Sequence, residues 1–182
     1  MDSLTFITGN KNKLLEAKYI LGEETIEQLN IDVEEIQDTD GKKVSVNKLV
    51  KLLYDNYHFN GYPVFCEDTS LEIDNMNGFP GALVKFYYNS LGDDKVVQFN
   101  GGSKAKMISW IAYSCNDKIE TFKGETEGTI PTTPMTGNYG FGFDAVFVPD
   151  GSTKSLAQMP VEEKMIYSAR YKALIELKKI IN

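Results

Sequence analysis

The segment from Thr8 to Lys13 combines small and basic residues in a way that is typical of phosphate binding. It follows the short apolar run Leu4–Ile7, which predicts a buried strand, and it reads Thr8-Gly9-Asn10-Lys11-Asn12-Lys13. The free N–H groups and the positive dipole end of the helix expected next form a site for an anion. Glycine lets a phosphate approach the backbone, and Lys13 can bind a phosphate oxygen. The alternative is an ordinary strand, turn and helix with solvated lysines.

Two acids, Glu67 and Asp68, stand before Thr69 at the end of the short strand expected over 64–66. Acids at a strand end beside an anion site suit Mg²⁺, which binds through one or two carboxylates and substrate phosphates. Because side chains alternate along a strand, we expect only one of the two acids to contact the metal. The alternative is a polar strand end. His58 is the only histidine. This count excludes a metal site made of several histidines and disfavours a histidine-based catalytic triad.

Two further groups suit a nucleobase. Aromatic residues beside a glycine can form a flat slot, in which stacking contributes about 1–3 kcal/mol per base, and this pattern is Phe141-Gly142-Phe143-Asp144. Lys164 and Arg170 can donate hydrogen bonds to the carbonyl edge of a base. The alternatives are core aromatics for the first group and a solvated helix face for the second.

Apolar periodicity and turn residues indicate the elements that must position these groups. Helices are expected over 12–21 and 45–57, over two short segments 82–90 and 93–99, and over 160–180 with an interruption. Extended segments are expected over 25–33, 64–66, 107–115, 119–127 and 145–148. A polar loop is expected over 34–43 and a rigid turn over 78–81. This order predicts an α/β protein with a mixed sheet.

The composition fits one globular domain over residues 1–182, because 42% of the residues are apolar and 25% are charged. A net charge of −7 disfavours nucleic-acid binding, which depends on cations along a phosphate backbone. No apolar run approaches the roughly 20 residues that a membrane span needs. Cys66 and Cys115 match no disulfide or metal spacing, and the first residues do not resemble a signal peptide. We therefore expect a cytoplasmic protein.

Taken in order, the groups resemble the inosine triphosphate pyrophosphatase family. The matching stretches are TGNKNK, EDTSLEIDNMNGFPG, GFGFDAVFVPDG and MPVEEKMIYSAR. The resemblance implies a mixed, twisted sheet flanked by helices, with two lobes and an active cleft between them, and a homodimer. It also implies Mg²⁺-dependent hydrolysis of ITP, dITP and XTP to the monophosphate and pyrophosphate.

The resemblance assigns roles by position. Asp68 matches the acid that binds Mg²⁺ and acts as general base, and Glu35 matches a second metal carboxylate. If Asp68 binds the metal, its pKa falls, and Glu67 or a metal-activated water is the alternative base. The residues that match substrate contacts are Thr8, Gly9, Asn10, Lys11, Asn12, Lys13, Lys48, Thr69, Lys85, Phe141, Gly142, Phe143, Asp144, Lys164, Ala169 and Arg170.

The chain departs from the family pattern at three positions. Ser70 stands where a glycine or another small residue is usual, Met165 stands in place of an asparagine, and Ala169 stands in place of a histidine. The last departure concerns base selectivity more than hydrolysis. A donor such as Arg170 pairs with the 6-carbonyl of hypoxanthine or xanthine and leaves the amino group of adenine unpaired, which can discriminate by about 10⁴. The alternative functions are a pyrophosphatase of other modified nucleotides, a nucleotide sensor without hydrolysis, and a phosphatase that releases orthophosphate.

Overall fold

The computed structural model describes residues 4–22, 26–56, 59, 61–116 and 118–181. Within them a seven-stranded mixed sheet has the order β2-β1-β3-β5-β6-β7, with β4 paired to β3. The strands are β1 (Leu4–Ile7), β2 (Ile26–Leu29), β3 (Val64–Ile73), β4 (Pro80–Gly81), β5 (Lys104–Cys115), β6 (Lys118–Thr129) and β7 (Val148–Pro149). The helices are α1 (Lys11–Leu21), α2 (Gly41–Asp55), α3 (Val84–Asn100), α4 (Val161–Tyr167) and α5 (Ala169–Ile181). Short 3-10 helices include η3 (Asp74–Met76), η4 (Gly142–Val146) and η5 (Leu156–Gln158).

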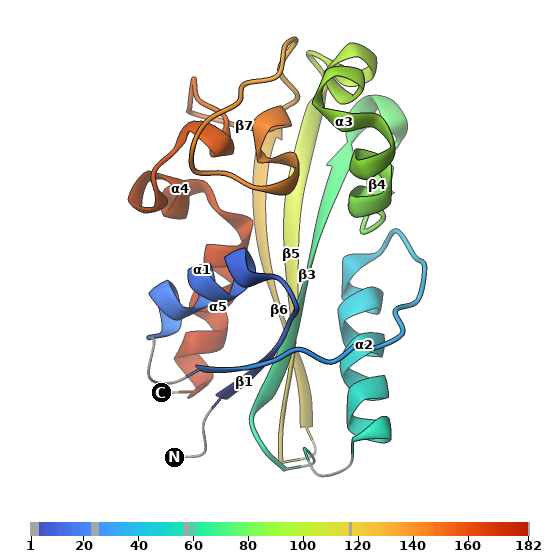
Figure 1. Cartoon of the computed structure of the whole chain (residues 1–182), viewed down its shortest axis with the longest axis vertical. Helices are drawn as coiled ribbons and strands as arrows, with labels where there is room; N and C mark the ends of the chain where they lie inside the picture. The colour runs from blue at the N-terminus through green and yellow to red at the C-terminus, as the bar shows by residue number, and fades with distance from the viewer. Residues whose placement is uncertain (1–3, 23–25, 57–58, 60, 117, 182) are drawn as a thin grey trace.

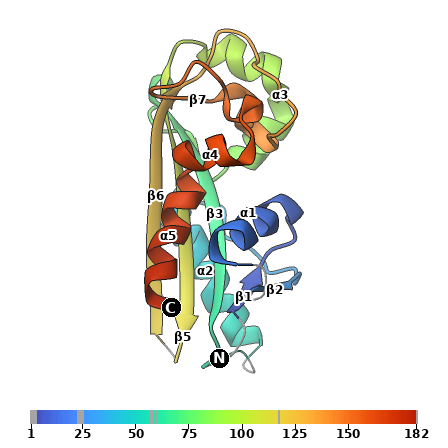
Figure 2. The same cartoon turned by 90° about the vertical axis from the view of Figure 1, so that its left-hand side faces the viewer.

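The sheet carries two lobes, as the resemblance implied. Figures 1 and 2 show β3, β5 and β6 running through most of the length of the molecule. One end of the sheet carries β1, β2, α1, α2 and α5, and the other end carries α3, β4, β7 and α4 (Figure 1). The mixed α/β fold with a twisted sheet and flanking helices is therefore confirmed.

Strand β3 has one edge that is only partly paired. Strand β5 pairs with it antiparallel along its whole length, so β1 and β4 share the opposite edge. Strand β1 pairs there in parallel as far as Cys66, and β4 pairs antiparallel at Leu71 and Glu72. No described strand pairs with residues 67–70 on that edge. The stretch that holds the predicted acids is therefore open between the two lobes.

The alternation of side chains along the central strands separates the core into clusters. Phe65 and Ile111 point to one face, where they pack with side chains of α1 and α5. Cys66 and Ala112 point to the other face, where they pack with apolar residues of α2. In the other lobe, Leu71 belongs to a third cluster with residues of α3, η4 and η5. The polar residues of β3 lie between the first and third clusters.

Several expected elements have different bounds. Helix α2 begins at Gly41 rather than Ser45, because Asp40 Oδ1 accepts hydrogen bonds from the N–H groups of the next two lysines and caps the helix. The expected end of this helix at Tyr57 lies outside the described residues, as do His58 and residue 25 at the start of an expected strand. Regular β structure between residues 26 and 33 is limited to Ile26–Leu29.

Two predictions about strands are wrong. The strand expected over 64–66 continues to Ile73, because β5 pairs with it residue by residue, so the acids lie within a strand and not at its end. The strand expected over 145–148 is mostly the 3-10 helix η4, in which Val146 and neighbouring Phe147 are fully buried, and only Val148–Pro149 pairs with β6. Four apolar residues do not distinguish a strand from another buried segment.

Other predictions are confirmed. Strand β5 lies between β3 and β6, as its two apolar faces indicated. The two short helices expected over 82–90 and 93–99 form α3, which bends at Gly92, where φ is 70° and ψ is 174°. The last helix is interrupted at Ser168, where the backbone is extended. In the part of the chain that is described, no helix is both long and apolar enough to cross a membrane.

Candidate active site

The phosphate-binding segment lies at the start of α1. Asn10 has extended backbone angles and caps the helix, since its Oδ1 accepts hydrogen bonds from the N–H groups of Asn12 and Lys13 at 2.9 and 3.3 Å. The N–H of Asn10 donates to Thr8 Oγ1. Two N–H groups that we expected to be free for an anion are therefore bound to Asn10. Lys11 and the positive end of the helix remain available to attract an anion, and Lys13 can offer one only the N–H group that its contacts with Glu67 leave over.

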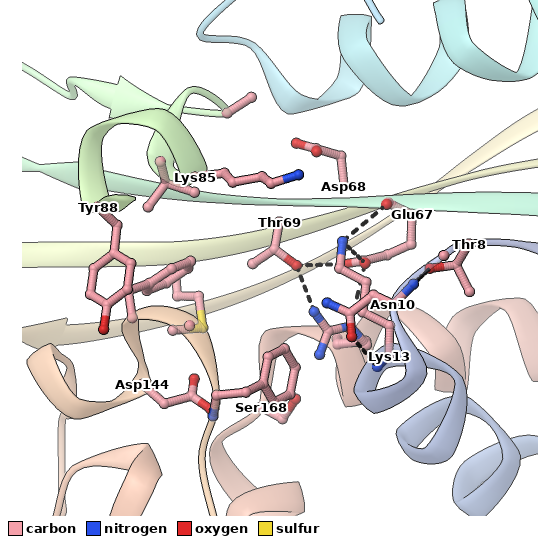
Figure 3. A pocket seen from close by; sticks show the side chains of 18 of the residues that line it. Thr8, Asn10, Lys13, Glu67, Asp68, Thr69, Lys85, Tyr88, Asp144 and Ser168 are labelled. Atoms are coloured by element: carbon pink, nitrogen blue, oxygen red, sulfur yellow. Dashed lines mark hydrogen bonds and ion pairs between the residues drawn. The ribbon is translucent and has the colours of Figure 1, made fainter. Parts of the chain in front are cut away.

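Lys13 joins this segment to β3. Its Nζ lies 2.8 Å from Glu67 Oε2 and also donates to the Glu67 backbone oxygen at 3.3 Å (Figure 3). Glu67 Oε1 accepts hydrogen bonds from the hydroxyls of Thr69 and Ser109. Burial alone would raise the pKa of Glu67, but the charges of Arg170 and Lys13 outweigh it and hold the pKa well below its ordinary value. Glu67 is thus an ionised anchor whose oxygens are occupied.

Asp68 has the opposite environment. It points to the other side of β3 from Glu67, as the alternation predicted (Figure 3). Its Oδ2 is buried and has no hydrogen-bond partner among the described residues. A Cβ added to Gly41 would lie 3.3 Å from this oxygen, so the start of α2 covers it closely. Burial raises the pKa of Asp68 to about 7, with contributions from Glu67 and Glu35, against the opposing charges of Lys13 and Lys48.

Three other predicted residues surround Asp68. Glu35, in the segment before α2, forms an ion pair with Lys48 on that helix. The charges of both residues reach Asp68, because both contribute to its pKa. Lys85 extends from α3 toward Asp68 from the other lobe (Figure 3). The main chain holds these lobes together here, since the Ala82 N–H donates to the Thr39 backbone oxygen.

A buried network of alternating charges lies beside the acids. Glu16 of α1 binds Lys164 Nζ at 2.8 Å and also accepts a hydrogen bond from Arg170 Nη1. Lys164 also binds Asp144 Oδ2 at 2.8 Å. Arg170 donates to Thr69 Oγ1 at 2.9 Å, and its Nε lies 3.4 Å from Glu67 Oε2. Charged groups this deeply buried are stable only when they are paired, so the network fixes α1, β3, η4, α4 and α5 relative to one another.

The predicted base pocket lies on this network. Lys164 Nζ is 4.6 Å from the centroid of the Phe141 ring, and the Arg170 guanidinium carbon is 5.5 Å from it. The Phe141 N–H donates to Asp144 Oδ2, which places the aromatic ring next to the carboxylate. Arg170 is largely committed to Glu16, Thr69 and Glu67. Lys164 has three N–H donors and uses two of them, one for Glu16 and one for Asp144.

One cavity of about 730 Å³ connects the groups. Its lining includes nearly all of the predicted residues: Thr8, Gly9, Asn10, Lys11, Lys13, Glu35, Lys48, Asp68, Thr69, Lys85, Phe141, Gly142, Phe143, Asp144, Lys164 and Arg170. Two predicted substrate contacts do not line it. Asn12 is exposed on α1, and Ala169 is fully buried in the third cluster. Helix α5 starts so close to β6 that a Cβ at Gly124 would lie 1.8 Å from the Ala169 oxygen.

The sequence analysis missed some lining residues and one supporting residue. Tyr88 and Ser168 line the cavity, and Glu16 holds the two cations behind it. A charged residue beside Ala17 on the apolar side of a helix was a weak signal for Glu16. No signal in the sequence indicated Tyr88, because its place in the cavity wall depends on how α3 packs against residues distant in the chain.

Comparison with known proteins decides the family. The model of the Ham1 family matches residues 4–180. The chain is 36% identical to the inosine triphosphate pyrophosphatase of Kluyveromyces lactis, over 98% of this chain and 95% of that protein. It is 34% identical to the dITP/XTP pyrophosphatase of Methanopyrus kandleri, over 93% of this chain and 90% of that protein.

The chain belongs to the Ham1 family. The fold agrees, because the structure of a HAM1 protein from Coxiella burnetii matches it with a TM-score of 0.81. That match covers 100% of this chain and 98% of the other at 22% sequence identity. The resemblance stated from the four sequence stretches is therefore confirmed at the level of the family.

The acids of this Ham1 protein fit a magnesium ion that is shared with a substrate. The described residues contain no group of three or more side chains suited to hold a metal by themselves. Mg²⁺, however, is usually held by one or two carboxylates and by substrate phosphates. Asp68 offers a buried oxygen without a partner, and Glu35 is the nearest predicted second carboxylate. This donor set suits a metal that arrives with a polyphosphate.

Proposed function

We propose that this Ham1 protein hydrolyses ITP, dITP and XTP to the monophosphate and pyrophosphate in a Mg²⁺-dependent reaction, and so removes aberrant purine nucleotides. The observation that carries the proposal is the single cavity that joins the lysines, a buried carboxylate without a partner and an aromatic slot. The names of relatives that match nearly the whole chain support the same reaction.

The lysines around the acids bind the triphosphate. Lys13, Lys48 and Lys85 approach from α1, α2 and α3, so they surround the tail from three sides of the cavity. Asp68 and Glu35 would hold Mg²⁺, which would neutralise phosphate charge and polarise a water. The acidic net charge of the chain is thus offset locally, where a polyanion must bind.

Asp68 suits the role of general base better than Glu67. Both oxygens of Glu67 are engaged by cations or hydroxyls, and its pKa is far below the ordinary value. Asp68 has a free oxygen and a pKa of about 7, close to the pH at which a base works efficiently. The pKa of about 7 belongs to the protein without metal, and a bound Mg²⁺ would lower it. The same ion would also lower the pKa of a water that it binds, so Asp68 would hold the metal with one oxygen and offer the other to that more acidic water. Positioning and charge stabilisation supply most of the remaining catalysis.

The aromatic slot and Lys164 bind the base. The ring of Phe141 offers a stacking surface, and the remaining N–H of Lys164 can donate to the 6-carbonyl of hypoxanthine or xanthine. Arg170 supports this end by holding Thr69 and Glu67 in place. Adenine presents an amino group where the carbonyl would be, so its complex would leave two donors facing each other.

A substrate panel tests the proposal. ITP, XTP, GTP, ATP and a modified pyrimidine nucleoside triphosphate are each incubated with Mg²⁺ or with a chelator, and the phosphate products are identified. We expect pyrophosphate from ITP and XTP with Mg²⁺ only. Release of orthophosphate would identify a phosphatase, and binding without any product would identify a nucleotide sensor. Preference for a modified pyrimidine nucleotide would identify a different pyrophosphatase. Each of these outcomes would contradict the proposal.

A homodimer and a cytoplasmic location belong to the same proposal. The homodimer follows from the family resemblance, and sedimentation velocity of the purified chain tests it. The cytoplasmic location is supported by the two cysteines, Cys66 and Cys115, which are both free thiols. Fractionation of the cells that produce the protein tests the location.

A further inference from the structure

The hydroxyl of Tyr88 is a polar group at the apolar end of the cavity. Tyr88 lies on α3 and lines the cavity with the apolar residues Val84, Met107 and Phe143. It faces the part of the cavity wall that carries Asp144 (Figure 3). No step of the proposed hydrolysis uses it, yet a hydroxyl among apolar side chains strongly influences which ligand edge can bind there.

The hydrogen of this hydroxyl is already committed. Tyr88 Oη donates to Asp93 Oδ1 at 2.7 Å. Residues five apart do not face each other on a regular helix, where neighbours are three or four apart. The bend at Gly92, whose positive φ of 70° favours glycine, brings the carboxylate back to the ring. The local backbone therefore fixes both the ring and the direction of the O–H bond.

The hydroxyl can act toward a ligand only as an acceptor. Burial, the hydrogen bond to Asp93 and the charges of Asp93 and Asp144 raise the pKa of Tyr88 to about 12. The group therefore stays protonated at physiological pH, and its one hydrogen points at Asp93. A lone pair remains for the cavity, and donation to a carboxylate makes the oxygen a stronger acceptor.

A hydrogen-bond donor, Lys164, lines the same cavity as this acceptor. Lys164 Nζ binds Glu16 and Asp144 at 2.8 Å each, which leaves one N–H for a ligand. Asp144 connects the two sides, because it binds Lys164 and its charge reaches Tyr88. The apolar end of the cavity thus presents one donor and one acceptor. A 6-oxopurine presents the complementary pair on adjacent atoms, a carbonyl at position 6 and an N–H at position 1.

We propose that Tyr88 Oη accepts a hydrogen bond from the N1–H of a 6-oxopurine and is a specificity-determining residue of this chain. This inference rests on the proposed function and deepens it. Adenine carries a lone pair at N1, so it would place two acceptors against each other. A buried mismatch of this kind costs more than a hydrogen bond gains. Tyr88 therefore supplies part of the selectivity expected of the histidine that Ala169 replaces.

The test compares Tyr88→Phe with the matched control Tyr87→Phe. Both variants lose one hydroxyl from adjacent residues of α3, but the Tyr87 hydroxyl accepts from Asn100 Nδ2 at 2.7 Å, and Tyr87 does not line the cavity. Calorimetry without metal gives the Kd of inosine monophosphate and of 1-methylinosine monophosphate, which lacks the N1 hydrogen. These ligands report on base binding without hydrolysis.

We expect Tyr88→Phe to raise the Kd of inosine monophosphate about tenfold, which corresponds to about 1.4 kcal/mol of binding free energy. The Kd of the methylated ligand should change less than about twofold. The control should change neither. Equal effects on the two ligands, or no effect on either, would overturn the role of Tyr88. If the wild-type protein releases pyrophosphate from ITP in that case, the proposed function stands and only this inference fails. A wild-type protein that neither binds inosine monophosphate nor hydrolyses ITP would overturn both.

Discussion

Replacing Asp68 with asparagine should inactivate the protein and stabilise it at the same time. The ionised carboxylate is buried at the open edge of β3, and one of its oxygens has no partner among the described residues. Without metal and substrate, this charge has no compensating contact of its own. The substitution Asp68→Asn removes the charge and keeps the shape of the side chain.

The size of the effect follows from the pKa of the group. A rise from the ordinary value of 3.8 to about 7 corresponds to about 4 kcal/mol of unfolding free energy. Because the pKa is raised in the folded state, the folded protein binds the proton more tightly, and stability is lost as pH rises from about 4 to about 7. Above that pH the wild-type protein carries the full cost, which the variant avoids. For a chain of this length 1 kcal/mol shifts Tm by about 2–4 °C, so the expected gain at pH 8 is about 8–16 °C.

The assay is thermal unfolding of the wild-type protein, Asp68→Asn and the control Asp94→Asn in chelator, at pH 4.5 and pH 8. Asp94 is exposed on α3, so its substitution should leave Tm nearly unchanged. Asp68→Asn should exceed the wild-type Tm clearly at pH 8 and only slightly at pH 4.5. Pyrophosphate release from ITP with Mg²⁺ should fall at least about 100-fold, the contribution of a positioned base.

Two results would refute this reasoning. A Tm at pH 8 that is equal to or below that of the wild-type protein would show that the ionised carboxylate is not a buried, uncompensated charge. A gain of the same size at both pH values would show that the stabilisation does not come from titration of Asp68. Activity near the wild-type level would remove Asp68 from the mechanism whatever the stability.

Other side chains give predictions of their own. Glu16→Gln should lower the unfolding free energy at pH 7 by about 2–4 kcal/mol, because two buried cations lose a charged partner. The control Glu163→Gln, at a partly exposed ion pair with Lys154, should cost less than about 1 kcal/mol. Burial would raise the pKa of Glu16, but its buried partners Arg170 and Lys164 lower it. The difference in unfolding free energy between the wild-type protein and Glu16→Gln should therefore shrink as pH falls below about 4. Chemical denaturation that gives the same difference at pH 7 and pH 3 would contradict this. Phe141→Ala should lower kcat/KM for ITP by about 10–100-fold through lost stacking, and an unchanged value would place the base elsewhere. Burial raises the pKa of the Cys66 thiol to about 12, so the native protein should react with a thiol reagent at pH 8 only at the partly exposed Cys115, and fast labelling of both would contradict this burial.

Most of the predicted residues line one cavity, and those that spacing singled out are local in the chain. Thr8 to Lys13 form a turn and the start of α1, and Phe141 to Asp144 form one short segment, so spacing was enough to single them out. The opposite directions of Glu67 and Asp68 followed from the period of a strand. What the sequence did not reveal is that residues 67–70 have an open edge, since this depends on where β1 stops and β4 starts.

The other omissions have a similar cause. Glu16 meets Lys164 and Arg170 across about 150 residues, at separations of 148 and 154, and no local pattern specifies such partners. The Tyr88 hydroxyl meets Asp93 only because α3 bends at Gly92, and a periodic apolar pattern says nothing about the direction of a bend. Ala169 was assigned to the substrate by its position in the family pattern, and such a position does not reveal that this residue is fully buried outside the cavity lining.

The buried network of alternating charges has a consequence for biosynthesis. Glu16 and Glu67 leave the ribosome long before Lys164 and Arg170, which neutralise them in the interior. Until the last two helices are synthesised, the early strands and α1 cannot close over these carboxylates without burying unbalanced charge. Nascent or prematurely terminated polypeptides should therefore remain open and be degraded, and only the completed polypeptide can become compact.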